Sequence, residues 1–375
     1  MHNKSPCAAT DSIVARVTTS MDDLEVLFQD WASHGNHPLS PTQQLPWIKA
    51  SIDAFTPASG ISVVHVCRKD QVLAIAPLCR ERGYFRRFEL PGVRRLLEPS
   101  DFVYSDAEAL DVLADKLAEL SMPLSLYRLP GDSLVPAALK RAYKGRARVV
   151  CMEYKRYPFI DLAELDARNL LSRRLRQDIR RARRKSDNLG GVSFEVLRPE
   201  GKNDFLPMYQ ELLEVEAANW KGWAGTALVH DDIRRRFYEE YGVRASELGI
   251  LRMCFMRIND LAVAAQFAVE SGQRFWLLKI GYSEEYASCS PGMQLINETL
   301  HYASSSGLLS YEFLGTADQW TRRWTRNERK SLIVAVYPYT PGGLLAFMGD
   351  ASRYAWSKVF KKGAAYLGNL LSRKV

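Results

Sequence analysis

The stretch 281–300, GYSEEYASCSPGMQLINETL, places residue types that can bind an anion between a predicted strand and a predicted helix. Ser290 is a favoured helix N-cap, and Pro291 suits the first helical turn. The first backbone amides of a helix have no partner within it and attract anions, and the glycine that follows lets a ligand approach closely. Two interpretations are therefore open. The residues form only an ordinary start of a helix, or the amides of Gly292, Met293 and Gln294 bind an anion.

The elements around this stretch are predicted to form two related halves. Segments 60–78 and 249–271 each indicate two strands joined by a turn, at Lys69-Asp70 and Asn259-Asp260. The overlay of 60–78 on 249–267 matches the apolar pattern and suggests an internal duplication. In the second half we expect the following elements: helices at 169–186, 204–219, 231–245 and 291–306, and strands at 192–197, 274–282, 309–315 and 331–337. A right-handed crossover would bring the start of the 291–306 helix to the edge where the strands end.

Composition bounds the class of protein. The chain has 375 residues, a formal charge of +8 and 47% hydrophobic residues, which is typical of a soluble globular protein of two domains with anionic partners. The six cysteines form no C-x-x-C pair, which favours free thiols. We find no apolar core of a signal peptide and no run of about 18 apolar residues, so we expect a cytoplasmic protein.

The second half resembles the GNAT N-acetyltransferase superfamily. It is most similar to the bacterial CelD-like branch associated with cellulose and exopolysaccharide biosynthesis, which is related to Fem-type aminoacyltransferases. The resemblance rests on Glu216 and Trp324 with four motifs, NWKG at 219–222, LKIGY at 278–282, SPG at 290–292 and YEFLG at 311–315. It covers roughly 20–340, with a looser match through Trp47, APL at 76–78 and 126–130 in the first half.

This resemblance implies an α+β fold of tandem GNAT-like domains, each a mixed, mostly antiparallel sheet flanked by helices. The expected units are residues 1–158, a catalytic domain at 159–340 and a tail at 341–375. It also implies acyl transfer from acyl-CoA or a related thioester to an amine, with the pyrophosphate at Ser290, Gly292, Met293 and Gln294. The segment YASCSP at 286–291 lacks the basic residue and the first glycine of the common GNAT loop, so a carrier protein or transfer RNA stays open as donor.

Transfer to an amine needs a group that accepts a proton. Glu216, near a helix end before WKGWAG, is the predicted base, against the alternative of a solvated carboxylate. Lys279 interrupts an apolar strand and is predicted to hold an acidic group or oxyanion, against a surface lysine on an edge. The other candidates are Glu312 to orient the amine, Tyr282 as general acid, and Trp220 and Lys221 to contact substrate.

Other site types find no support in the sequence. His34 and His37 have no further His or Cys cluster, so we predict no metal. The chain has no G-x-S-x-G, P-loop or G-x-G-x-x-G motif. Cys289 lies beside the predicted phosphate site, but no histidine is placed by sequence to activate it. The alternatives to an acyl-CoA enzyme are a Fem-like transferase that uses aminoacyl-tRNA and a catalytically degenerate scaffold for polysaccharide export.

Two basic segments suggest partners. The run 168–185 places Leu171, Leu175, Ile179 and Ala182 on one helical stripe, so its cations should form a solvated face, or hold a transfer RNA in the Fem-like alternative. The tail 341–375 combines two apolar stripes with cations against the single acid Asp350. It predicts either a basic amphipathic helix on the inner face of an anionic membrane or a helix docked on the fold. The acceptor would be a saccharide or small-molecule amine.

Overall fold

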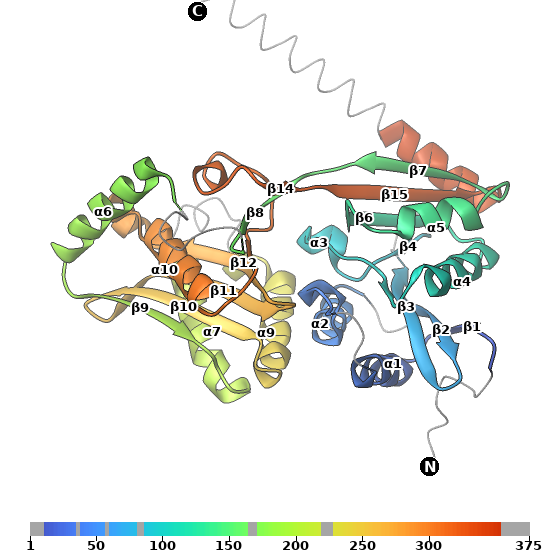
Figure 1. Cartoon of the computed structure of the whole chain (residues 1–375), viewed down its shortest axis with the longest axis horizontal. Coiled ribbons are helices and arrows are strands. Elements are labelled where there is room, and N and C mark those ends of the chain that lie inside the picture. The colour runs from blue at the N-terminus through green and yellow to red at the C-terminus, as the bar shows by residue number, and fades with distance from the viewer. Residues whose placement is uncertain are drawn as a thin grey trace, which may run out of the picture.

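The computed structural model describes residues 11–34, 38–56, 60–80, 86–163, 171–218 and 228–353. These residues form two sheets side by side, each flanked by helices (Figure 1). Within the described ranges, β12 pairs parallel with β13 and β4 with β6, and the other pairings are antiparallel. The predicted fold class, α+β with mixed and mainly antiparallel sheets, is confirmed.

The first sheet has the order β1-β2-β3-β4-β6-β15-β7, with β5 paired to β3. Its strands are β1 (Val14–Thr18), β2 (Ile61–Arg68), β3 (Gln71–Arg80), β4 (Phe88–Glu89), β5 (Val103–Tyr104), β6 (Leu124–Pro130), β7 (Ala147–Glu153) and β15 (Ser331–Pro338). The helices around it are α1 (Met21–Ser33), α2 (Leu45–Phe55), α3 (Val93–Leu96), α4 (Ala107–Glu119) and α5 (Val135–Ala142). Ser20 and Asp106 cap α1 and α4, as their residue types favour.

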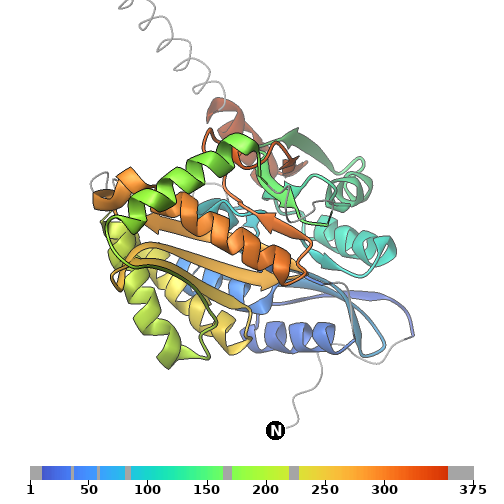
Figure 2. The ribbon, with the colours of Figure 1, turned by 60° about the vertical axis from the view of Figure 1, so that its left-hand side comes forward.

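The second sheet has the order β14-β8-β13-β12-β11-β10-β9. Its strands are β8 (Tyr157–Asp161), β9 (Val192–Leu197), β10 (Leu251–Ile258), β11 (Leu261–Ser271), β12 (Arg274–Tyr282), β13 (Ser310–Glu312) and β14 (Glu328–Arg329). Helices α7 (Lys202–Ala217) and α9 (Asp232–Glu247) pack on one face, and α6 (Arg173–Asp187) and α10 (Pro291–Ser305) on the other (Figure 2). The β10–β11 turn has positive φ at both Asn259 and Asp260, the geometry of a tight hairpin.

A two-stranded ribbon joins the two sheets. β7 and β15 pair in the first sheet, and β8 and β14 pair in the second. The chain runs from β7 into β8 and later returns from β14 into β15. The prediction that strand 331–337 completes the second unit is therefore wrong, because β15 lies between β6 and β7. Its apolar pattern predicts a buried strand but not which sheet buries it. The predicted boundary between 158 and 159 falls inside β8.

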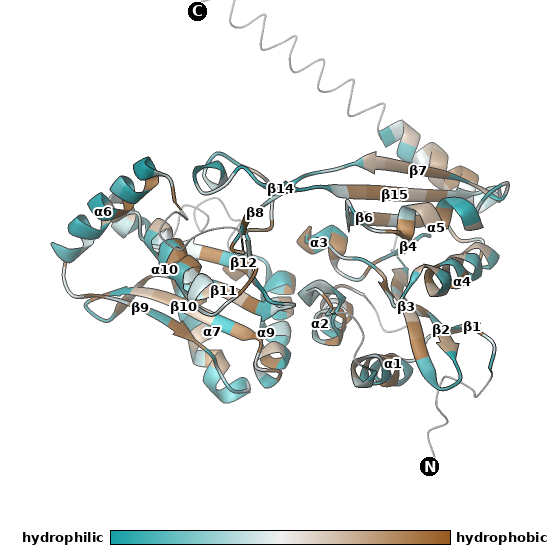
Figure 3. Cartoon of the chain, in the orientation of Figure 1, coloured by the Kyte–Doolittle hydropathy of each residue, from teal (hydrophilic) through white to brown (hydrophobic). Residues whose placement is uncertain are grey.

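A second contact between the halves is made by helices α2 and α9. Trp47 of α2 is 1% exposed and meets Phe237 and Tyr241 of α9 edge to face, with ring centroids 4.9 Å apart in both pairs. Trp47 thereby belongs to the same hydrophobic cluster as Phe205 of α7. The hydropathy colouring shows α6 to be mostly hydrophilic along its length (Figure 3). Leu175 and Ile179 of its predicted stripe, with Leu171 just before the helix, nevertheless pack in the core under the sheet, and Ala182 is buried, as predicted.

Candidate active site

Strand β12 carries a bulge and then separates from β13. Phe267 of β11 pairs with Lys279 and the next residue, Ala268, with Leu277, so Leu278 is the extra residue of a bulge. β13 pairs only with residues 274–276, so residues 277–282 of β12 have no partner in β13. A bulge and an unpaired strand edge both leave backbone groups without sheet partners. This opening is a place where a substrate can meet the strand backbone.

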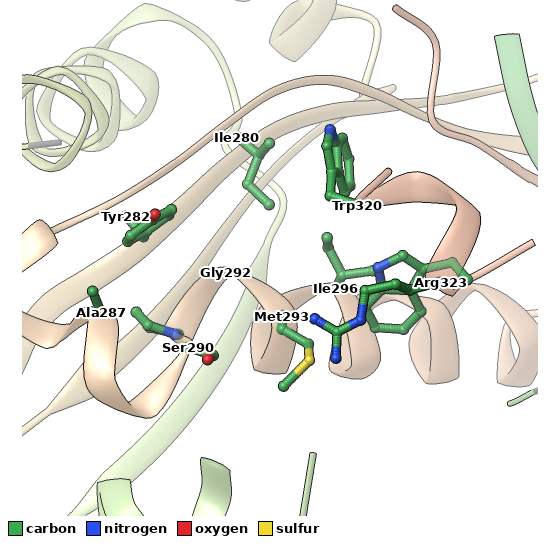
Figure 4. A pocket seen from close by; sticks show the side chains of 11 residues that line it. Ile280, Tyr282, Ala287, Ser290, Gly292, Met293, Ile296, Trp320 and Arg323 are labelled. Atoms are coloured by element: carbon green, nitrogen blue, oxygen red, sulfur yellow. The ribbon is translucent and has the colours of Figure 1, made fainter. Parts of the chain in front are cut away.

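The N-terminus of α10 borders a pocket of about 410 Å³ at this opening (Figure 4). Its lining comes from β12, from the turn and first residues of α10, and from the segment around η5 (Thr321–Arg323). Four of the predicted residues line it together: Tyr282, Ser290, Gly292 and Met293. A β-carbon on Gly292 would stand 3.4 Å from Cδ1 of Tyr282, so this glycine lies directly on the pocket wall.

The start of α10 differs from the prediction in its hydrogen bonds. Ser290 adopts a left-handed conformation (φ 50°, ψ 57°) and its side chain caps nothing. Its carbonyl accepts hydrogen bonds from the amides of Met293 (3.1 Å) and Gln294 (3.2 Å). The prediction that these two amides are available to a phosphate is therefore wrong. Among the described residues, the amide of Gly292 donates to no backbone carbonyl, so it alone of the three faces the pocket without such a bond.

Gln294 does not line the pocket. Its side chain is 2% exposed, and its amide nitrogen donates to Oγ of Ser186 in α6 (2.7 Å) and to the carbonyl of Cys289 (2.8 Å). Nζ of Lys185 also donates to the carbonyl of Ser288 (3.1 Å). Gln294 thus ties the turn before α10 to α6, a structural role that its position in sequence does not reveal.

The opposite wall of the pocket was not predicted, although Trp324 is one of the residues that carry the resemblance. Trp320, Arg323 and Trp324 line it, and Figure 4 shows the Arg323 guanidinium near Met293. Arg323 also forms an ion pair with Asp178 of α6 (2.8 Å) and keeps half of its side chain exposed. The repeated Trp and Arg in WTRRW at 320–324 were the available signal, because aromatic and guanidinium groups together suit an anionic ligand with an apolar part.

Glu216 is held against β12. It is 3% exposed, and its Oε2 accepts a hydrogen bond from the amide of Leu228 (3.1 Å). A β-carbon on Gly281 would lie 3.1 Å from Cα of Glu216, so helix and strand touch at this point. The alternative of a solvated carboxylate does not hold, because Glu216 is buried. Its role as a base remains a prediction.

A buried charge cluster that sequence analysis did not identify surrounds Lys279. The Lys279 ammonium lies 5.1 Å from the ring centroid of Tyr238. Glu98, from the first half, is 8% exposed, and burial raises its pKa to about 7 although Arg128 and Lys279 oppose the rise. Both terminal nitrogens of Arg128 donate to the carbonyl of Gly315 at 3.0 Å. Lys279 therefore lies among groups from both halves of the chain.

Glu312 is engaged in ion pairs. It is fully buried, accepts hydrogen bonds from Arg329 at 2.8 Å to 3.1 Å, and lies 3.7 Å from Arg274. Ser310 also donates to it at 2.7 Å. Its carboxylate is thus held by neighbouring side chains and does not line the pocket at α10.

The remaining candidates divide as follows. Tyr282 lies on the pocket wall, where burial and Glu284 raise its pKa. Trp220 and Lys221 lie outside the described residues. Cys289 is buried and its thiol hydrogen bonds to the carbonyl of Tyr286.

Three further observations concern other sites. The described free cysteines are Cys79, Cys151, Cys254 and Cys289, whereas Cys67 is disulfide-bonded, so the prediction of free thiols fails at this residue. Scattered spacing does not show which cysteines folding brings together. Within the described ranges, no group of three His, Cys, Asp or Glu residues could hold a metal ion. In the same ranges, no helix has the length and apolar character needed to cross a bilayer.

Comparison with protein families matches residues 173–322 to the acetyltransferase (GNAT) domain. This segment contains β12, Glu216 and the lining of the α10 pocket except Arg323 and Trp324. Comparison with curated protein sequences gives no match.

Among solved structures, the chain is similar to FemX with a TM-score of 0.56 and 13% identity, over 82% of this chain and 95% of that one. A Bacteroides thetaiotaomicron protein of unknown function gives 0.53 and 11%, over 86% and 99%. L-PGS from Bacillus licheniformis gives 0.52 and 10%, over 83% and 96%. At these identities the likeness shows a shared fold. The family match over residues 173–322 identifies this segment as an acetyltransferase (GNAT) domain, and it supports an acyltransferase activity.

Proposed function

We propose that the protein transfers an acyl group from acyl-CoA, or a related thioester, to a primary amine at the opening of β12. The single observation that carries this proposal is the pocket between β12 and the N-terminus of α10, whose lining lies within the GNAT domain match except for Arg323 and Trp324. The donor carbonyl would lie at the bulge around Leu278, where the irregular β12–β11 ladder leaves a backbone amide to support the oxyanion.

The reaction would proceed by direct attack. The amine nitrogen forms a bond to the thioester carbonyl carbon, the carbon–sulfur bond breaks, and the thiolate leaves with the electron pair. The proton lost by the amine passes to Glu216, directly or through water, and the thiolate takes up a proton from solvent. Lys279, which lies beside Tyr238, would favour the developing negative charge.

The pocket fits the donor in part. Aromatic and aliphatic side chains supply walls for an apolar pantetheine arm, while the amide of Gly292 and the guanidinium of Arg323 supply anion contacts. Glu284 and Glu285, in the exposed turn before α10, would repel a phosphate placed near them. We therefore propose that the pyrophosphate lies toward Arg323 rather than over that turn.

The experiment compares two variants of the same residue, Gly292. Gly292→Asp puts a carboxylate in the pocket, and Gly292→Asn puts an isosteric neutral group there. Binding of acetyl-, succinyl- and long-chain acyl-CoA is measured by calorimetry, and transfer to amines by release of free thiol. We expect the Asp variant to lose CoA affinity far more than the Asn variant. Equal affinity of the Asp variant and the unaltered protein would place the donor elsewhere.

A second candidate donor, aminoacyl-tRNA, is favoured by one observation. Helix α6 exposes a row of cations beside α10, namely Arg173, Arg174, Arg176, Arg180, Arg181, Arg184 and Lys185. A basic helix face of this kind suits a phosphate backbone. Filter binding of aminoacylated tRNA, measured against salt, separates the two donors, because only the nucleic acid would give a steep dependence on ionic strength.

We also propose that the tail places the enzyme at an anionic membrane, near an amino sugar of an exopolysaccharide or the cell envelope. Residues 341–353 are helical and pack on β15 through Ala346 and Phe347, while Asp350 bonds to Arg87 and Tyr337 at 2.8 Å. The docked alternative thus holds for this part of the tail. Leu344 and Met348, predicted on one apolar stripe, stay 58% and 48% exposed on another side of the helix. An exposed apolar stripe beside cations suits a lipid surface.

A further inference from the structure

A second cavity, the inter-sheet cavity, lies where the two halves of the chain meet. Its volume is about 250 Å³. Residues 38–40, 43, 99, 130 and 132 line one side of it, and residues 157, 271, 272, 274, 276 and 329 line the other. Trp276 in its wall packs in the core shared with α7 and α9, whereas Ile280 faces the pocket at α10. The two cavities therefore lie on opposite faces of the second sheet.

One wall of the inter-sheet cavity carries an excess of positive charge. Arg274 and Arg329 both approach the single buried carboxylate of Glu312. Arg329 donates three hydrogen bonds of 2.8 Å to 3.1 Å to this carboxylate. The Arg274 guanidinium lies 3.7 Å from it, and 40% of the Arg274 side chain is exposed. One carboxylate neutralises one guanidinium, so Arg274 keeps donors for an anionic ligand.

The facing wall carries a carboxylate. Asp132 lines the cavity, is exposed, and forms no hydrogen bond or ion pair with any side chain that the structure describes. It is close enough to Tyr157 and Arg329 to affect the pKa of both. A carboxylate and a guanidinium that face one cavity without pairing with each other match a ligand that carries both charges.

The cavity also lies at the start of the β12 opening. Trp276 and Glu312 are the last residues that pair β12 with β13, and beyond them the strands separate. The Trp276 indole donates to the carbonyl of Ser271 (3.0 Å), which fixes this wall. Lys279 follows Trp276 by three residues on the same strand, about 10 Å at the rise of a β-strand. A ligand in the inter-sheet cavity would therefore approach the acyl group from the face opposite the donor.

We propose that the inter-sheet cavity binds the acceptor of the transfer reaction, and that this acceptor is a small zwitterion with an ammonium group, a carboxylate or phosphate, and a second amine that reaches the β12 opening and is acylated. Asp132 binds the ammonium group of this ligand, and Arg274 binds its acid group. The inference rests on the proposed function, because it names the substrate class of that reaction.

The test is direct binding by titration calorimetry, with L-lysine and L-ornithine as zwitterions that carry a second amine, and with spermidine and succinate as ligands of one charge. We expect a zwitterion to bind at one site and Asp132→Asn and Arg274→Gln each to weaken it about tenfold, the loss of one charge-assisted hydrogen bond. Asp318→Asn and Arg326→Gln, at exposed positions outside the cavity, are matched controls.

Failure of both zwitterions to bind, or unchanged affinity in both cavity variants, would overturn the inference. Asp132 is exposed, so its variant tests the idea even if Arg274→Gln folds poorly. CoA binding in the same proteins separates the two proposals. If CoA binds and the zwitterions do not, only the proposal of an acceptor site is wrong. If none of the proteins binds CoA, the proposed acyl transfer from CoA is wrong as well.

Discussion

Gly281 and Glu216 touch where helix α7 crosses strand β12. A β-carbon on Gly281 would lie 3.1 Å to 3.4 Å from Cα, Cβ and Cγ of Glu216, closer than ordinary contacts. A larger residue at 281 would therefore push the helix and its carboxylate away from the strand. The glycine sets how near the predicted base lies to the bulge and the opening of β12.

We expect Gly281→Ala to cost about 1–3 kcal/mol of stability through overpacking and to lower turnover as Glu216 shifts. Gly191→Ala is the matched control, because a β-carbon there would meet only Asn259, at 4.0 Å. Denaturant unfolding and thiol release are measured on both variants. If Gly281→Ala keeps full stability and activity, the contact between Gly281 and Glu216 does not position the Glu216 carboxylate.

Glu216→Gln should keep the hydrogen bond from Leu228, because the Gln side chain also has an acceptor oxygen. As the loss of a general base, it should lower turnover by about 10²–10⁴-fold with little change in donor affinity. Glu214→Gln, exposed on the same helix, is the control. If the two variants turn over equally, the proton goes to another group, such as Glu98.

Sequence patterns predicted the elements better than their assembly. Strand 274–282 and the hairpin turn at Asn259-Asp260 were predicted at their observed positions, because alternation and turn residues are local signals. The placement of β15 and the cluster of Glu98 with Arg128 and Lys279 depend on residues far apart in sequence. The left-handed Ser290 was also unpredictable, because its residue type favours a side-chain cap that the backbone here replaces.

Glu98→Gln should change stability in a pH-dependent way. Burial raises the pKa of Glu98 from 4.5 to about 7, so the folded state binds its proton more tightly than the unfolded state does. That contribution is present below pH 4.5 and is lost as pH rises toward 7. The ionised carboxylate then opposes folding by on the order of 3 kcal/mol at pH 8, an effect that Gln removes.

Unfolding of Glu98→Gln and of the unaltered protein is therefore compared at pH 5 and pH 8. We expect the variant to be the more stable protein at pH 8 and nearly equal at pH 5. Burial also raises the pKa of Asp101 to about 7, but Asp101 is present in both proteins and cancels in the comparison. A difference of the same size at both pH values would contradict the raised pKa of Glu98.

Arg323→Ala should weaken CoA binding by about tenfold, the loss of one charge-assisted hydrogen bond. Arg322→Ala is the neighbouring control, since Arg322 is exposed and does not line the pocket. The Arg323–Asp178 ion pair is half exposed, so stability should fall by no more than about 1 kcal/mol. Both variants are titrated with CoA by calorimetry. Identical affinities would show that Arg323 does not contact the phosphates of CoA.

The last prediction concerns the tail and the membrane. Truncation after residue 340 would remove Asp350, which bonds to Arg87 and Tyr337, and would disturb the fold itself. Truncation after Arg353 keeps this docked helix and its exposed Leu344 and Met348. It removes the following cations: Lys358, Lys361, Lys362, Arg373 and Lys374. Each cation near an anionic bilayer contributes about 1 kcal/mol.

We therefore expect the 375-residue chain to sediment with anionic liposomes at low salt and the chain ending at Arg353 to stay largely in solution. Binding should weaken steeply with salt and be absent on neutral liposomes, because the attraction is electrostatic. Leu344→Asn together with Met348→Asn in the 375-residue chain tests the apolar stripe separately from the charges. Equal sedimentation of the 375-residue and truncated chains would show that the residues after 353 do not hold the enzyme at a membrane, and the docked helix would then be the only role of the tail that its contacts support.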